Sequence, residues 1–275
     1  MPQTRSTPGA SIAGDVTQPP ISASGPFSLV AQLRTNDAAG ADRAEQVVHQ
    51  LETAIAVGLI GHGQRLPPER ELAAQLGVAV LTLRTALASL RDRGFIETRR
   101  GRGGGSAVCD AGVVTEKERR LRLREHSTEE LRDLGDLSGG IAAASARLAA
   151  ARSDRSDQLR LRNLAEAFST ARTPLDRRRA DSRFHIGIAV AAQSRRLTTA
   201  TVQVQGDIAP LLWASDPSGQ LFAWDEAAQD HAAIVASIVA GDEAAAQSAA
   251  LAHCARETEA VINAHFELAM TETGF

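Results

Sequence analysis

One stretch, Arg65–Gly105, constrains the fold of this chain more than any other. It begins RLPPERELAAQLGV and ends with the glycine-rich tip RRGRGGG. Pro67 and Pro68 suit the first turn of a helix, and Gly77 suits a helix end. The pattern therefore predicts a short helix over Glu69–Leu76.

A second short helix is predicted by apolar residues at helical spacing, namely Leu83, Leu87 and Leu90. Gly94 is typical of a helix end. Beyond it, residues 95–98 favour a short strand, residues 99–105 a turn and residues 107–108 a return strand. Two short helices followed by a hairpin indicate a winged helix-turn-helix.

The segment from Ala44 to Val108 resembles the DNA-binding domain of the GntR family of bacterial transcription regulators. The run LPPERELAAQLGV and the tip RRGRGGG carry this resemblance. It implies that the second helix enters the major groove of double-stranded operator DNA and that the wing contacts the backbone or the minor groove. By position, it implies that Arg70 holds phosphate and that Arg84 reaches base edges or phosphate. Arg102 and Gly103 would form the wing contact.

One departure from the family concerns the start of the second helix. The family usually has Ser-Arg-Thr-Pro-Val-Arg here, whereas this chain has Ala-Val-Leu-Thr-Leu-Arg over residues 79–84, so Val80 replaces the usual arginine. An arginine bidentate to guanine gives roughly 1–3 kcal/mol of discrimination. We therefore do not expect the family's usual operator sequence, and weaker DNA binding is a second possible consequence.

Basic charge gathers on this segment although the whole chain has a net charge of −3. Such asymmetry favours a phosphate-facing surface. The alternatives are a winged helix used only for protein contacts and a nucleotide-binding phosphate loop. The second alternative lacks the GxxxxGK[ST] pattern. The charged residues of the helix and wing are Arg84, Arg91, Arg93, Arg99, Arg100 and Arg102, against Asp92 and Glu97.

The composition of the 275-residue chain predicts two domains and a mainly α fold. Aromatic residues make up 3%, tyrosine is absent, and alanine and leucine dominate the second half. We expect a disordered segment over 1–40, a winged domain over 41–110 whose first helix spans 41–57, a linker over 111–128 and a helical domain over 129–275. The charged run 116–125 favours a solvated helix over a second nucleic-acid patch.

Nothing in the sequence predicts a membrane span or a secretory signal, so we expect a cytoplasmic protein without a membrane partner. Cys109 and Cys254 are too few for a disulfide framework and are expected to be reduced.

About six helices are predicted after Glu129, with breaks at Ser153-Asp154, Thr173-Pro174, residues 216–219 and Gly241-Asp242. No heptad persists for three repeats, so the pattern favours a bundle over a coiled coil.

Four residues of this bundle form a candidate site: Asp181, His185, His231 and His253. Asp181 and His185 lie four residues apart, so one helix face presents a carboxylate and an imidazole that can share a cation. His231 is expected near the start of its helix, on a stripe with Ile234 and Ile238, and His253 in the last helix. Taken singly, each histidine is more often a hydrogen-bonded core residue than a ligand.

The span 131–266 resembles the effector domain of the FadR-like GntR subgroup, an antiparallel all-helical bundle. Its metal-binding members show D-x-x-F-H, then H-x-x-I-x-x-A-I-x-x-G-D, then a last histidine. This chain has DSRFH from Asp181, HAAIVASIVAGD from His231, and His253. The resemblance implies a divalent metal on Asp181, His185, His231 and His253, together with a small carboxylate effector.

Two departures concern that effector. The arginine that many members carry early in the first bundle helix is missing from LSGGIA over 137–142, and Ser194 replaces a frequent asparagine. The effector-binding residues are therefore unknown, with Arg147 or Arg183 as substitutes, and loss of the effector response is a further alternative.

The leading interpretation is a homodimeric, metabolite-responsive regulator of transcription. One carboxylate and three imidazoles suit Zn²⁺ best, with Ni²⁺, Co²⁺ or Mn²⁺ as alternatives. A purely structural metal without an effector is the second interpretation. A metal-dependent hydrolase is the third, but neither H-E-x-x-H nor a Glu at motif spacing is available as a general base.

Overall fold

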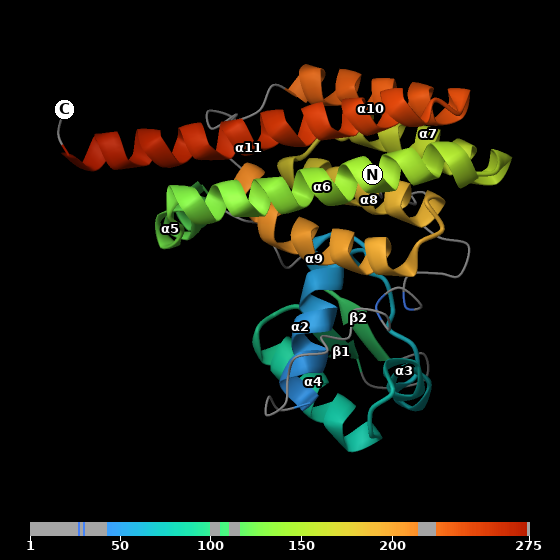
Figure 1. Ribbon diagram of the computed structural model, residues 1–275. Helices are drawn as coiled ribbons and strands as arrows, with labels where there is room; N and C mark the ends of the chain where they lie inside the picture. Colours follow the sequence, from blue (N-terminus) through green and yellow to red (C-terminus); the bar gives the residue numbers. More distant parts are fainter. Residues whose placement is uncertain are drawn as a thin grey trace, which may run out of the picture.

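The computed structural model describes residues 27, 30, 43–99, 105–109, 116–213 and 224–273 of the chain. Within them the protein is mainly α-helical, with one small sheet. The N-terminal part is a winged helix-turn-helix, at the bottom of Figure 1. Its elements are α2 (Arg43–Ala56), α3 (Glu69–Leu76), α4 (Val80–Asp92), β1 (Ile96–Arg99) and β2 (Gly105–Val108).

The two short helices follow from local signals in the sequence. The bounds predicted for α3 are confirmed, and Gly77 ends this helix with a left-handed φ of 64°. Helix α4 begins at Val80 after Ala79, whose side chain gives no capping hydrogen bond. Gly94, with a φ of 79°, turns the chain into β1. The hairpin pairs β1 and β2 antiparallel, with Ile96 opposite Val108.

The C-terminal part is an antiparallel bundle of helices, in which α6 and the long α11 run side by side in opposite directions (Figure 1). The predicted breaks at residues 153–154, 173–174 and 241–242 are confirmed. Asp154 and Thr173 cap the helices that follow them, and the Asp242 carboxylate accepts a hydrogen bond from the Ala245 amide. The elements are α5 (Glu116–Glu125), α6 (Thr128–Arg152), α7 (Arg155–Thr170), α8 (Pro174–Ala191), α9 (Arg195–Leu212), α10 (Trp224–Ala240) and α11 (Glu243–Thr273).

Helix α10 begins earlier than the sequence predicts. It starts at Trp224, so His231 lies in its middle and not near its start. His231, Ile234 and Ile238 are buried together, which confirms the predicted stripe.

Helix α8 connects the bundle with the winged domain. The Arg183 guanidinium donates a hydrogen bond of 2.6 Å to the Gly58 carbonyl just beyond α2, and Arg178 donates one of 3.3 Å to the Ala56 carbonyl. Gly58 has a φ of 73°, and a Cβ added there would lie 2.9 Å from the Cβ of Arg179. The backbone after α2 therefore packs directly on α8, and one continuous apolar core runs from the winged domain into the bundle.

Helix α5, for which a solvated helix was predicted, packs against α9 and α11. Most of its side chains are exposed, but Leu123 is fully buried in a second core cluster, and His265 of α11 lies 3.0 Å from the Leu123 carbonyl.

In the described part of the chain, no single helix has the length and apolar character needed to cross a membrane. The pair α3 and α4, bent by 103°, passes that test jointly on length and composition alone.

Candidate metal centre and nucleic-acid interface

The structure brings together the four residues predicted as metal ligands. Asp181 and His185 come from α8, His231 from α10 and His253 from α11, and all four are buried. One ligand atom from each lies within 4.8 Å of the other three. Helical spacing explains only the first pair; the packing of three helices supplies the rest.

The distances within this cluster fit a shared cation. His231 Nε2 lies 3.3 Å from His253 Nε2 and 3.5 Å from Asp181 Oδ1. His185 Nε2 lies 3.9 Å from Asp181 Oδ1. Two atoms that each bind a metal at about 2.0–2.2 Å cannot be more than twice that distance apart, so these separations are compatible with one common ion.

Hydrogen bonding in the cluster is incomplete. Asp181 Oδ1 and His185 Nε2 are buried without a hydrogen-bond partner in the described structure. Buried polar atoms are normally paired, because leaving one unpaired costs about 1–3 kcal/mol. The two atoms lie 3.9 Å apart, so one cation between them would satisfy both.

Neighbouring residues hold the cluster in place. The Trp213 indole donates a hydrogen bond of 3.1 Å to Asp181 Oδ2, which leaves Oδ1 for the centre. Asp230 Oδ2 lies 3.1 Å from His253 Nδ1, and a proton on that nitrogen leaves Nε2 free to bind a metal. The Phe184 ring stacks on His231 with 3.9 Å between ring centres.

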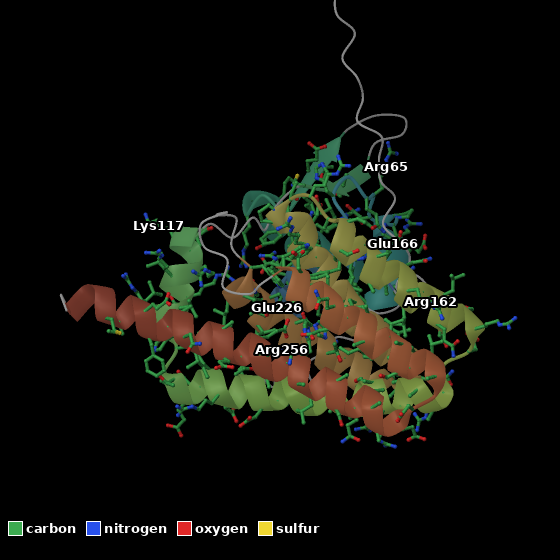
Figure 2. All side chains as sticks on the ribbon, turned by 90° about the horizontal axis from the view of Figure 1, so that it is seen from above. Arg65, Lys117, Arg162, Glu166, Glu226 and Arg256 are labelled. Carbon is green, nitrogen blue, oxygen red and sulfur yellow. The ribbon has the colours of Figure 1, made fainter. Side chains whose placement is uncertain are left out.

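Arg256 supports this arrangement from outside. Its Nη2 lies 2.5 Å from Asp230 Oδ1, and its Nε donates to Asp230 Oδ2. Figure 2 labels Arg256 and Glu226 where α10 and α11 run side by side. Arg256 and Asp230 together therefore orient His253.

The sequence analysis missed one residue of the cluster, Glu257 of α11. Its carboxylate is fully buried, with Oε1 3.4 Å from His253 Nε2 and 3.9 Å from His185 Nε2. Neither oxygen has a partner that meets hydrogen-bond criteria among the described residues. Glu257 follows His253 by four residues, the same spacing that identified Asp181 with His185, so this signal was present in the sequence.

The electrostatics of the cluster reflect burial and mutual charge. Burial, with the charge of Glu257, raises the pKa of Asp181 well above its usual value. Burial lowers the pKa of His185 to about 4 and that of His231 well below its usual value. Burial would also lower the pKa of His253, but the Glu257 charge and the hydrogen bond to Asp230 raise it to about 10. A divalent cation would instead favour charged carboxylates and neutral imidazoles.

A small cavity adjoins the cluster at His185. Its volume of about 10 Å³ has room for about one water molecule. Ser145 Oγ of α6 and Gln205 Oε1 of α9 come from residues that line it, and both are buried without a hydrogen-bond partner in the described structure. The two arginines considered as effector ligands bind elsewhere: Arg147 pairs with Glu243 at 3.0 Å, and Arg183 reaches Gly58.

The winged domain exposes two of the residues predicted to contact nucleic acid. Arg70 on α3 and Arg84 on α4 are both exposed, and Arg84 forms a 2.7 Å ion pair with Glu69. Arg93 instead binds Glu45 and Glu52 of α2. Arg102 and Gly103, predicted to form the wing contact, lie outside the described residues.

Comparison with protein families gives two matches. A model of the GntR family of bacterial regulatory proteins matches residues 43–104, and an FCD domain model matches residues 133–256. The first covers the winged domain. The second covers α8 and α10 completely, together with the part of α11 that carries His253.

Individual relatives are transcription regulators. The chain is 40% identical over 215 residues to the inferred HTH-type transcriptional regulator RmpR of Mycobacterium gastri, covering 78% of each chain. It is 31% identical over 159 residues to the Glc operon transcriptional activator of Escherichia coli K12, covering 56% of this chain and 62% of that protein. A solved GntR regulator of Rhodococcus sp. RHA1 aligns with a TM-score of 0.45 and 19% identity, over 82% of this chain and 99% of the other.

Proposed function

Because the chain belongs to the GntR family and is a DNA-binding transcription regulator with an FCD domain, we propose that its helical domain binds a divalent metal and a small carboxylate effector. The family consists of regulators and not of enzymes, which rules against the hydrolase interpretation. The proposed metal ligands are Asp181, His185, His231 and His253.

The observation that carries this proposal is the convergence of buried donor atoms without partners. Asp181 Oδ1 and His185 Nε2, one turn apart on α8, are both buried without a hydrogen-bond partner in the described structure and lie 3.9 Å from each other. His231 and His253 bring two further imidazole nitrogens 3.3 Å apart. Hydrophobic residues would fill such a site at lower free-energy cost, so the polar set indicates a ligand.

The bound metal would polarise and bind an effector carboxylate, acting as a Lewis acid and a template. The cavity at His185, with the unpaired Ser145 and Gln205 oxygens nearby, lies where an effector would approach. Its present size admits only about one water. Effector binding would therefore have to widen the cavity, whereas the structural-metal alternative requires no change.

At the other end of the molecule, we propose that a homodimer presents two copies of α4 to a two-fold symmetric operator. A single recognition helix buries too little surface for specific binding, so half-sites are normally read in pairs. Arg70 would contact phosphate, Arg84 would contact base edges or phosphate, and Arg102 with Gly103 would contact DNA through the wing.

Elemental analysis of two histidine variants tests the metal site. His231→Ala should lose most of the metal, whereas His126→Ala, a histidine outside the cluster, should retain it. Equal metal content in wild type and His231→Ala would rule out the proposed site.

Operator binding, measured in the presence of a carboxylate and of its amide, then distinguishes a metal site that binds an effector from one that is purely structural. A sensor should respond to the acid and not to the amide, because only the acid completes the metal shell and favours one arrangement of the dimer. Bound metal without any response would favour the structural alternative.

A further inference from the structure

Glu257 of α11 is a buried acidic residue beside the four proposed metal ligands. Its side chain is entirely buried, and neither carboxylate oxygen has a partner that meets hydrogen-bond criteria among the described residues. A buried carboxylate is stable only when a nearby cation offsets the cost of removing it from water.

The surroundings of Glu257 show where the compensation lies. Oε1 faces two imidazole nitrogens, His253 Nε2 at 3.4 Å and His185 Nε2 at 3.9 Å. These two nitrogens belong to the proposed metal ligands. Arg256, one residue earlier, instead forms its ion pair with Asp230.

We propose that Glu257 is a fifth protein ligand of the metal, an internal carboxylate supplied by α11. This inference rests on the proposed metal site and deepens it. The ligand set becomes two carboxylates and three imidazoles, drawn from α8, α10 and α11. The two carboxylate charges then balance the charge of a divalent ion.

This ligand set changes the expected metal and the expected response. Five protein ligands exceed the four of a closed tetrahedral zinc site and favour an ion that accepts five or six ligands, such as Mn²⁺, Co²⁺ or Ni²⁺. An octahedral ion would retain one further position, which matches a cavity with room for about one water. An external carboxylate would have to displace Glu257 or take that single position.

Cobalt binding to the full-length protein tests the assignment, because the visible absorption of Co²⁺ reports its ligand number and geometry. Glu257→Gln changes a single atom of the carboxylate and should preserve the fold, which thermal melting would verify. We expect at least the 10–100-fold loss of Co²⁺ affinity that outer neighbours of metal ligands cause, together with a changed spectrum. Glu259→Gln, an exposed position on the same helix, should match wild type.

Rescue by a small acid gives a second, independent measurement. Glu257→Ala removes a CH₂–COO⁻ group, and acetate has nearly the same shape. Added acetate should restore Co²⁺ affinity and the wild-type spectrum in Glu257→Ala, while raising the Co²⁺ affinity of wild type and Glu259→Gln far less. Acetamide, which lacks the charge, should not rescue.

The outcomes separate this inference from the proposal on which it rests. Wild-type protein that fails to bind Co²⁺, or His231→Ala that binds it as well as wild type, would overturn the metal site itself. If wild type binds, His231→Ala does not, and both Glu257 variants keep wild-type affinity and spectrum, only the role of Glu257 is overturned.

Discussion

The ion pair between Arg84 and Glu69 predicts that substitutions of its two residues have opposite effects on DNA affinity. The pair is 2.7 Å long, and the two side chains are 64% and 45% exposed, so solvent screens it strongly. An exposed pair of this kind is worth about 0.2–1 kcal/mol. If Arg84 contacts phosphate, this pair must be broken or shared, and Glu69 repels the same phosphate. We therefore expect Glu69→Gln to tighten binding about two- to thirtyfold in a dimer.

Arg84→Ala should weaken DNA binding. The salt dependence of this loss shows whether a phosphate contact was removed. Each lost phosphate contact lowers the slope of log affinity against log salt by about 0.9, and so by about 1.8 for two copies. The affinity gap from wild type should then widen about twelvefold between roughly 200 mM and 50 mM salt.

Fluorescence anisotropy titrations with a selected operator, at four or more salt concentrations, measure both effects. Arg147→Ala provides a matched control, because Arg147 forms an exposed pair with Glu243 on the bundle at 3.0 Å. A wild-type slope for Arg84→Ala, with unchanged affinity for Glu69→Gln, would refute a phosphate contact by Arg84.

Four further predictions concern metal, recognition and stability. Chelation should lower the melting temperature, because metal at several hundred times its dissociation constant contributes roughly 3–4 kcal/mol; an unchanged calorimetric transition would contradict this. Val80→Arg should raise DNA affinity and move selected sequences toward the usual family operators, and unchanged selection from a random pool would mean that α4 docks differently. Ala79→Ser should supply the missing cap of α4, because Ala79 already has the extended backbone of an N-cap residue, and should add about 0.5–2 kcal/mol to the free energy of unfolding in urea. Gly135→Ala should cost about 1–3 kcal/mol in the same assay, because its Cβ would lie 2.2 Å from a carbon of Thr258, whereas Gly140→Ala, with nothing within 4 Å, should be neutral or stabilising.

The helices of the winged domain could be predicted from the sequence because their signals are local. Gly77 and Gly94 both adopt the positive φ that glycine tolerates, and α3 has the predicted bounds. The apolar spacing of Leu83, Leu87 and Leu90 identified the buried face of α4. The start of α10 was placed too late, because Trp224 follows a segment with few helix signals of its own.

The metal cluster was predictable only in part. The pair Asp181 and His185 follows from spacing along one helix, and resemblance to a family supported the addition of His231 and His253 from later helices. Contacts between different helices have no comparable signal in the sequence. The hydrogen bond from Trp213 to Asp181 and the contact between Asp230 and His253 form only when the helices pack together. Glu257 was missed for another reason, since it is one of several acidic residues of α11 and acidic residues on helices are usually solvent-exposed.

The hydrogen bonds from α8 to the end of α2 have a consequence for any attempt to divide the protein. The carbonyls of Ala56 and Gly58 at that end accept from Arg178 and Arg183, and Gly58 rests against Arg179. A fragment cut after the wing would expose these carbonyls and part of the shared apolar core to water. We therefore expect the isolated winged domain to be less stable than the same domain within the whole chain.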